Sequence, residues 1–434
     1  MSTESFSIVN AAQFEGQKVV LHGWARHIRS SGSLFFIEMR DGTGILQVVV
    51  AKDDVSQEVF QECAKIRIES SLQVRGTLKE ERRAPGGYEI LAEDVKPIQV
   101  PTQEYPLSKK AHGTDFLMEH RHLWIRSNRQ LAILKVRSRL VRLLRDYFHD
   151  RGFVLIDTPI LTGSIGESAG NLFQIKYFDL GDAYLAQTGQ LYLEAAASAL
   201  GKVFCLGPTF RAEKSKTRRH LTEFWMLEAE MAFHDTNMNM DLQEDMIATV
   251  VAGVLASCET ELSVLKRDVE PLKKIRSPFP RIDYGEAIQL LGEKGFNISW
   301  GDDIGGDEET SLSERFDNPV FVCNYPREIK AFYMMPNLED ERTVLNNDLL
   351  APEGYGEIIG GSQRNHDLDS LRQRIEEEGL DPASYRWYLD LREYGSVPHA
   401  GFGLGIERLL SWICKLPHVR EAIPFPRLIN RIYP

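Results

Sequence analysis

FRAEKSKTRRHLTEF, residues 210–224, concentrates five cationic side chains and a histidine in a chain that is otherwise acidic. The whole chain of 434 residues carries 63 Asp and Glu against 51 Lys and Arg. Two apolar segments flank it, and both are typical of strands: KVFCLGPTF at its start and FWMLEAEMAF, which begins at Phe224. The sequence therefore predicts a long basic loop between the two strands of a hairpin.

This loop has the composition of a polyphosphate site. Arginine offers a rigid bidentate fork to phosphate oxygens, and a carboxylate such as Glu213 can accept from an adenine amino group. A solvated charged hairpin is the alternative, which the loop alone favours. Two features shift the balance: Asp348 and Glu357 are candidate metal ligands in strand-rich text, and GFGLGIER brings Arg408 to a helix start behind three glycines. No Walker A motif is present.

Length and composition limit the class of protein. A chain of this length predicts two domains, and 43% hydrophobic with 26% charged residues is typical of a soluble globular protein. No apolar run could span a bilayer and the N-terminal text lacks a secretory signal, so we expect a cytoplasmic protein with no membrane partner. The five cysteines lack CxxC spacing, which favours free thiols over zinc or disulfides. A net charge of -12 argues against indiscriminate coating of nucleic acid, but not against a focused surface.

Residues 1–105 are predicted to form a first domain. Their order of strand, strand, strand, helix, strand is typical of a five-stranded OB barrel, and a barrel without a ligand is the alternative. Phe35 and Phe36 alternate, so we expect one in the core and the other exposed, where it could stack on a base. Residues 106–127 are predicted to be a linker or hinge, and residues 128–434 a large mixed domain.

Three segments of the large domain carry a resemblance to a known family. The basic loop with FWMLEAEMAF is similar to motif 2 of the class II aminoacyl-tRNA synthetases, and GFGLGIERLL is similar to motif 3. The predicted long helix RQLAILKVRSRLVRLLRDYFHDRG with the strand FVLIDTPIL, ending at Pro159, is similar to motif 1. RHLWIR, MRDGTGILQ and GQLYLE resemble the aspartate/asparagine/lysine subgroup, and in it the asparagine enzymes of the compact archaeal type.

The resemblance implies an α+β fold. It consists of an N-terminal OB-fold β-barrel for the anticodon and a class II catalytic domain, whose six-stranded antiparallel sheet is flanked by helices. A homodimer through motif 1, around Pro159, is implied as well. ATP would bind bent over the sheet, with Mg²⁺. The implied ATP site consists of Arg211, Glu213, Arg219, His220, Leu221, Phe224, Glu357, Gly405 and Arg408.

Roles within this site follow from the motifs that the residues occupy. Arg211, Glu357 and Arg408 are the implied catalytic residues: Arg211 would bridge the α-phosphate and the amino acid's carboxylate, and Arg408 would cover the adenine. Glu357 would hold Mg²⁺, and Asp348 stays a candidate ligand of the same ion from its place in the sequence. Phe224 would stack beneath the adenine. Arg219 and His220 are expected at the outer phosphates, and Glu213 at the adenine amino group.

The amino-acid site is implied to consist of Glu167, Gln190, Leu193, Arg211, Glu228 and Arg364. Aspartate enzymes carry a lysine at the position of Leu193 and an aspartate at that of Glu228. Glu228 would accept from the amide NH₂ of L-asparagine while Arg364 donates to its oxygen; aspartate would present a second anion to Glu228. Core packing of Leu193, with Glu228 pairing Arg364 alone, is the alternative. Glu167 would bind the α-amino group, or else lie in a flexible loop.

On the barrel, the resemblance implies that Phe36 stacks on the middle anticodon base, that Gln47 bonds its edge and that Arg29 adds to the same surface. The expected reaction ligates L-asparagine to tRNA(Asn) through an asparaginyl-adenylate, consuming ATP and releasing AMP and pyrophosphate. Three alternatives are an aspartyl-tRNA synthetase-like activity, a relative that makes asparagine from aspartate, and a catalytically silent tRNA-binding relative. The barrel argues against the second, and the retained ATP residues argue against the third.

Overall fold

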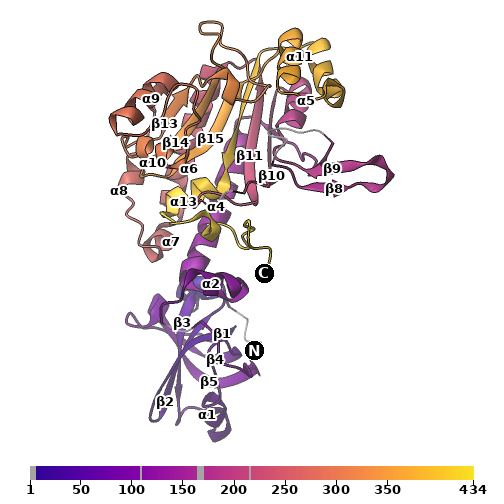
Figure 1. Cartoon of the computed structure of the whole chain (residues 1–434). Helices are drawn as coiled ribbons and strands as arrows, with labels where there is room; N and C mark the ends of the chain where they lie inside the picture. Colours follow the sequence, from indigo (N-terminus) through magenta and orange to yellow (C-terminus); the bar gives the residue numbers. More distant parts are fainter. Residues whose placement is uncertain (1–5, 108–109, 164–170, 215–216) are drawn as a thin grey trace. The chain divides into compact units, whose positions relative to one another are not determined.

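In the computed structural model the chain forms two compact units, the first ending at Gly113 and the second beginning at Thr114 (Figure 1). The residues described are 6–107, 110–163, 171–214 and 217–434. Residues 114–127, which the sequence assigns to a linker, form α2 (Thr114–Glu119), α3 (Arg121–Trp124) and the approach to the next helix. Arg121 is buried and donates to the carbonyls of Ile423 and Pro424 at 2.8 and 2.7 Å, so this segment is part of the second unit.

The first unit is a closed five-stranded barrel in the order β1-β2-β3-β5-β4. The predicted OB-fold succession is confirmed, because a helix separates the third and fourth strands. Alternate residues of β2 and β3, among them Ile37 and Val48, fill the core. The elements are β1 (Lys18–Ser31), β2 (Leu34–Arg40), β3 (Ile45–Ala51), α1 (Gln57–Cys63), β4 (Ser71–Glu80) and β5 (Tyr88–Gln99).

The second unit is built on an eight-stranded sheet in the order β12-β13-β14-β15-β16-β11-β10-β6. The six strands from β13 to β10 are antiparallel, as predicted, and β12 and β6 add parallel strands at the two edges. The strands are β6 (Val154–Leu155), β10 (Lys202–Phe210), β11 (Glu223–Ala232), β12 (Arg281–Asp283), β13 (Val320–Cys323), β14 (Asn346–Ala351), β15 (Gly356–Gln363) and β16 (His399–Gly405).

The strand predicted over FVLIDTPIL is shorter than expected. Pairing with β10 is confined to β6 and the N–H of Ile156, which donates to the carbonyl of Phe204 at 2.8 Å. Pro159 has no N–H to continue such a ladder. A separate three-stranded sheet follows, with β7 (Leu161–Thr162), β8 (Gln174–Lys176) and β9 (Asp182–Leu185).

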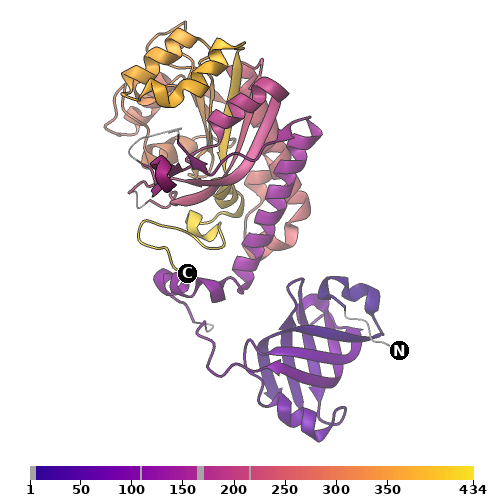
Figure 2. The same cartoon turned by 90° about the vertical axis from the view of Figure 1, so that its right-hand side faces the viewer.

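Helices cover one face of the large sheet (Figure 2). The predicted long helix is α4 (Asn128–Asp150); it packs with α6 (Thr236–Ser257) and α13 (Ile406–Cys414) in one hydrophobic core with the sheet. The other helices are α5 (Gln190–Leu200), α7 (Glu259–Val264), α8 (Glu270–Lys273), α9 (Tyr284–Glu293), α10 (Gly306–Ser313), α11 (Leu368–Glu377) and α12 (Arg386–Glu393). Among the helices of the described ranges, none is long and apolar enough to cross a membrane.

Alternation along β11 positions the functional residues. Leu227 and Ala229 join the core beneath the helices, so Glu228 and Glu230 face the opposite side of the sheet. On β15 a β-bulge adds one residue between Glu357 and Ile359. The alternation of β11 and the bulge of β15 therefore bring acidic side chains to the face opposite α4, α6 and α13.

Candidate active site

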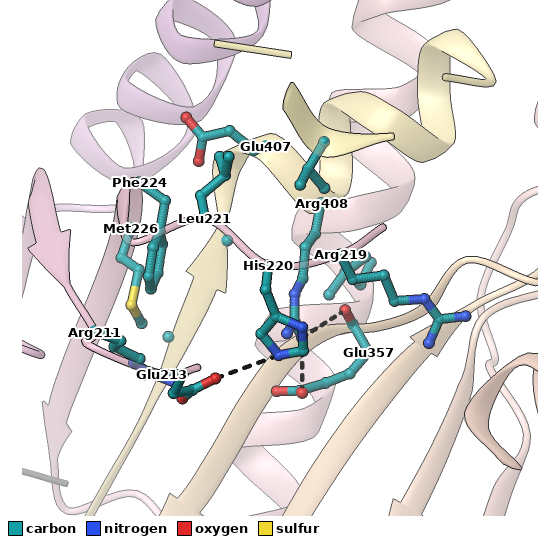
Figure 3. Close-up of a pocket in the computed structure, with 14 residues that line it drawn as sticks. Arg211, Glu213, Arg219, His220, Leu221, Phe224, Met226, Glu357, Glu407 and Arg408 are labelled. Carbon is teal, nitrogen blue, oxygen red and sulfur yellow. Dashed lines mark hydrogen bonds and ion pairs between the residues drawn. The ribbon is translucent and has the colours of Figure 1, made fainter. Parts of the chain in front are cut away.

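A cavity of about 630 Å³, open to solvent, lies between the basic loop, β15, β16 and the start of α13. Its lining includes every residue that the sequence assigns to ATP (Figure 3). The cavity brings together loop and helix residues that are almost 200 positions apart in sequence. These residues are Arg211, Glu213, Arg219, His220, Leu221, Phe224, Glu357, Gly405 and Arg408.

Phe224 and Arg408 enter this cavity from different elements, the start of β11 and the first turn of α13 (Figure 3). The Arg211 guanidinium carbon lies 5.5 Å from the centroid of the Phe224 ring. Leu221 is buried in a cluster with Val419 of the C-terminal segment, which supplies an apolar wall. A flat ring, an apolar wall and a guanidinium are surfaces on which an adenine can stack.

Glu213 and His220 face each other across the mouth of the cavity. His220 Nε2 lies 3.4 Å from a carboxylate oxygen of Glu213 (Figure 3). Burial lowers the pKa of His220, and the positive charge of Arg408 lowers it further. At neutral pH the imidazole is therefore expected to be neutral and to act as a hydrogen-bonding group.

Arg408 joins motif 3 to β15. Its Nη1 donates to the Glu357 carboxylate at 2.8 Å and to the Glu357 carbonyl at 3.2 Å. Burial opposes the ionised form of Glu357, but Arg408 and Lys330 outweigh it and hold the pKa of Glu357 below its ordinary value. Glu357 is thus a carboxylate at neutral pH, as a metal ligand has to be.

Arg219 is held away from the cavity centre by residues that the sequence did not single out. Its guanidinium donates to Glu309 at 2.7 Å, to the carbonyl of Gly354 at 2.8 Å and to the hydroxyl of Thr310. Burial and the neighbouring Glu357 carboxylate raise the pKa of Glu309 to about 7. Glu309 lies on α10, far from the motifs in sequence, and no spacing rule connects it to them.

Asp348 and Glu357 converge over Gly360. A Cβ on Gly360 would lie 3.3 Å from a carboxylate oxygen of Glu357 and 3.7 Å from one of Asp348. Lys330 donates to Asp348 at 2.9 Å, and this carboxylate, outweighing burial, raises the pKa of Lys330. Within the described ranges, no three His, Cys, Asp or Glu side chains are grouped to hold a metal. Two carboxylates do suit Mg²⁺, which takes one or two of them plus phosphate oxygens.

A second cavity adjoins the first. Arg211 and Glu357 line both cavities. Gln190, Glu228 and Arg364 line the second one, so the structure brings them together as predicted. Further lining residues that the sequence analysis did not assign are Thr188, Lys330 and Tyr333.

Glu228 is anchored at the beginning of α5. One carboxylate oxygen accepts from the backbone N–H of Gly189 at 2.8 Å, and the other accepts from the hydroxyl of Thr188. Cys205 approaches the same carboxylate, with its Sγ at 3.5 Å. Donors at a helix N-terminus stabilise a buried negative charge, so Glu228 has a fixed position at the cavity wall.

Arg364 is paired with Glu230, and the alternative that Glu228 is its carboxylate partner is wrong. Arg364 Nε donates to Glu230 at 3.1 Å, and Nη1 donates to Ser362 at 2.7 Å. Sequence reasoning missed Glu230, although its spacing of two from Glu228 placed both on one face of a strand. A guanidinium carries five N–H groups, so Arg364 can be held here and still donate to a ligand.

Two other predicted members of the amino-acid site lie elsewhere. Leu193 is fully buried in a small cluster with Ala197, Val203 and Cys205. It does not line the cavity, because its side chain packs between α5 and β10. The prediction that it contacts the substrate is therefore wrong, and the core-packing alternative describes it. Glu167 lies outside the described residues.

Comparisons with known proteins agree with this geometry. The family model described as tRNA synthetases class II (D, K and N) matches residues 113–429, and the model described as OB-fold nucleic acid binding domain matches residues 19–98. The asparagine–tRNA ligase of Symbiobacterium thermophilum is 53% identical over 428 residues, which are 97% of this chain and 98% of that protein. The chain belongs to the asparaginyl-tRNA synthetases.

Solved asparaginyl-tRNA synthetases share its fold. The Pyrococcus horikoshii enzyme complexed with asparaginyl-adenylate matches with a TM-score of 0.96 and 47% identity, covering 99% of this chain and 100% of that one. The Entamoeba histolytica enzyme, also in complex with asparaginyl-adenylate, matches with a TM-score of 0.88 and 33% identity over 98% of each chain.

The barrel of this asparaginyl-tRNA synthetase places the three predicted anticodon residues on one surface. Phe35 is buried, whereas Phe36 is partly exposed, with the Arg29 guanidinium carbon 5.6 Å from its ring centroid. Gln47 lies on the neighbouring strand and donates to Glu89 at 3.0 Å. The expectation that one phenylalanine is core and the other available is confirmed.

Proposed function

We propose that the two adjoining cavities activate L-asparagine with ATP and that the asparaginyl-adenylate is then transferred to tRNA(Asn), with release of AMP and pyrophosphate. The observation that carries this assignment is that Arg211 and Glu357 line both cavities. A nucleotide in the first cavity and an amino acid in the second would therefore meet between these two side chains. Two solved relatives are complexed with asparaginyl-adenylate, the intermediate that this proposal expects.

Activation requires positioning more than proton transfer. The α-carboxylate of the amino acid is ionised at neutral pH, so its attack on the α-phosphorus needs no general base. Arg211 would hold this carboxylate and the α-phosphate in line, and would neutralise charge that develops on the phosphoryl oxygens. Arg408 and Phe224 would hold the adenine, with Glu213 accepting from its amino group.

Mg²⁺ would be held by Glu357 and Asp348, whose oxygens converge over Gly360. The ion would neutralise charge on the phosphates and the departing pyrophosphate. Arg219 and His220 would contact the outer phosphates, and for this Arg219 would have to leave Glu309 and Gly354. Because burial lowers the pKa of Arg219, its present environment stabilises the cation incompletely.

Selection of asparagine would depend on Glu228 and Arg364. Glu228 already accepts from Gly189 and Thr188, and a carboxylate has further lone pairs for the amide NH₂ of asparagine. Arg364 would donate to the amide oxygen and Gln190 would contribute to the amino-acid cavity. An aspartate side chain would instead bring a second negative charge to Glu228.

Outside the active site, we infer that Phe36, Gln47 and Arg29 bind the anticodon, since a stacking ring beside hydrogen-bonding side chains suits unpaired bases.

A homodimer is supported by exposed apolar residues around Pro159, where Ile160 is 44% and Val154 is 42% exposed. The five buried, unpaired cysteines are consistent with a cytoplasmic protein.

Aminoacylation tests this proposal. The protein is incubated with radiolabelled asparagine, ATP, Mg²⁺ and a tRNA(Asn) transcript, and label in acid-precipitable RNA is counted. Charging that stops with EDTA and returns with excess Mg²⁺ is expected. Absence of charging with an active transcript would contradict the proposed reaction. Full charging with EDTA present would contradict the proposed metal site. Molar mass by light scattering tests the dimer, with the monomer mass as the contrary result.

A further inference from the structure

Glu194 is a buried carboxylate behind the amino-acid cavity that none of the roles above uses. It lies on α5, one turn after Gln190, and is 1% exposed. It is not among the residues that line the cavity. A charge so far from solvent requires several donors around it, and Glu194 has them.

Four side chains from three elements converge on this carboxylate. Arg392 of α12 donates to Oε2 at 2.6 Å, and the hydroxyl of Tyr388 lies 2.8 Å from both oxygens. His399 of β16 has its Nε2 2.9 Å from Oε2, and Gln190 donates to Oε1 at 3.1 Å. Burial opposes ionisation, yet Arg392 and His399 together hold the pKa of Glu194 below its ordinary value.

These contacts lead to two residues of the cavity. The first is Gln190 itself, whose amide is oriented by the bond to Glu194. The second is Arg364: its backbone N–H donates to the carbonyl of His399 at 2.8 Å, and the carbonyl of the next residue, Asn365, accepts from Arg392 Nε at 2.9 Å. Glu194 therefore contacts His399 and Arg392, whose hydrogen bonds fix the main chain at Arg364 and at the residue after it.

Stability alone does not account for this arrangement. A buried ion pair commonly contributes no more to folding than apolar residues of the same volume, whereas its directional bonds specify geometry. We propose that Glu194 is a positioning residue for asparagine binding, which sets the amide of Gln190 and the main chain of Arg364. This inference rests on the proposed amino-acid site and adds a residue to it that acts without touching the substrate.

Glu194→Gln tests the inference by ATP–pyrophosphate exchange with asparagine and ATP varied separately. The new amide NH₂ would face donors, Arg392 and Tyr388 among them, so the orientation of Gln190 is lost. Because bonds to a charged group are strong, the KM for asparagine is expected to rise about tenfold or more, with the KM for ATP changed by less than about twofold. Equal changes in both KM values would overturn the inference.

A matched control separates positioning from the loss of any buried carboxylate. Glu421 is also buried and accepts from a glutamine, Gln130, at 3.1 Å and from an arginine, Arg129, at 2.8 Å. It lines neither cavity. Glu421→Gln is expected to leave the KM for asparagine unchanged. A rise equal to that of Glu194→Gln would assign both effects to general loosening of the fold and would overturn the inference.

One further variant keeps the test decisive if Glu194→Gln does not fold, and a double-mutant cycle with Gln190→Ala sharpens it if Glu194→Gln does fold. Arg392→Lys preserves the charge beside Glu194 but removes the Nε bond to Asn365, and should raise the KM for asparagine alone. In the Gln190→Ala background, Arg392→Lys should still raise the KM for asparagine, because it acts through Arg364. Glu194→Gln should raise this KM less than it does in wild type, because its effect through Gln190 is already lost. Full additivity of Glu194→Gln and Gln190→Ala would contradict a role through Gln190. Wild-type exchange with asparagine is measured alongside, because its absence would refute the proposed function itself.

Discussion

The Glu230 carboxylate holds the Arg364 guanidinium in a buried ion pair, with Nε 3.1 Å from Oε1. Glu228, two residues earlier on the same strand face, accepts instead from Gly189 and Thr188. The two carboxylates thus divide their tasks. Glu230 orients the arginine, and Glu228 lines the wall of the cavity.

Replacing Glu228 tests the second of these tasks. In Glu228→Gln the amide NH₂ meets either the donors of the protein or the NH₂ of the substrate, so kcat/KM for asparagine exchange should fall by about 10- to 100-fold. Aspartate should lose less, because the opposing charge is gone. Exchange rates with both amino acids check this, and a proportionate loss for both would contradict the assigned role in selection.

Replacing Glu230 tests the first task. Glu230→Gln leaves the Arg364 cation buried beside a neutral amide, which is expected to lower the free energy of unfolding by about 3–5 kcal/mol. Urea denaturation followed by circular dichroism measures this change, and asparagine exchange should fall with it. An unchanged midpoint would show that the ion pair is not essential to the folded structure.

Arg211 is the side chain expected to stabilise the transferring phosphoryl group. Arg211→Ala should lower kcat for ATP–pyrophosphate exchange by about 100- to 1000-fold. Arg218 provides the control on the same loop, because it donates to the carbonyl of Gly354 and does not line the cavity. A similar loss in Arg218→Ala would mean that loop charge, and not the position of Arg211, governs the rate.

The stability of the protein is expected to depend on pH through His418, the neighbour of Val419 in the C-terminal segment. Burial, reinforced by Arg420, lowers the pKa of His418 to about 4, and its Nδ1 accepts from the N–H of Arg420 at 3.1 Å. A depressed native pKa means that the unfolded chain binds the proton more tightly. The contribution of His418 to the free energy of unfolding is therefore fully present above pH 6.5 and is lost as pH falls to about 4. The loss amounts to at most about 3 kcal/mol.

Denaturation curves of wild type and His418→Gln between pH 7 and pH 4 check this prediction. The wild type should lose more stability on acidification than the variant, since other titrating groups are common to both. Curves that stay parallel would show that His418 does not contribute to acid sensitivity.

Phe36 should matter only when tRNA is present. Loss of a stacked ring costs about 1–3 kcal/mol per base, so Phe36→Ala should raise the KM for tRNA(Asn) about tenfold or more and leave exchange without tRNA unchanged. Phe36→Tyr keeps the ring and should restore binding. An unaltered KM for tRNA in the alanine variant would remove Phe36 from the anticodon surface.

How much the sequence predicts differs between the fold and the site. Periodicity and motif order predict α4, the β10–β11 hairpin and the convergence of Phe224 with Arg408, because each depends on local pattern or on a recurring motif. The sequence did not predict the pairing of Arg364 with Glu230, since a choice between two carboxylates on one strand face is made by tertiary packing.

Residues outside the motifs were harder to predict. Glu309, Lys330 and Glu194 act on the cavities from elements whose position depends on the whole fold. Leu193 was assigned to the substrate because a lysine occupies its position in aspartate enzymes. Leucine has no polar end group, and the side chain of Leu193 packs between α5 and β10 with Val203 and Cys205.

Glu228 and Arg364 are proposed to select the amide of asparagine. ATP–pyrophosphate exchange with asparagine and aspartate side by side, in the presence of Mg²⁺, tests it most directly. We expect exchange with asparagine and a kcat/KM for aspartate lower by about 100-fold or more, because the site is built to hydrogen-bond the preferred group. Comparable exchange with aspartate would contradict it, while leaving the ATP site as described.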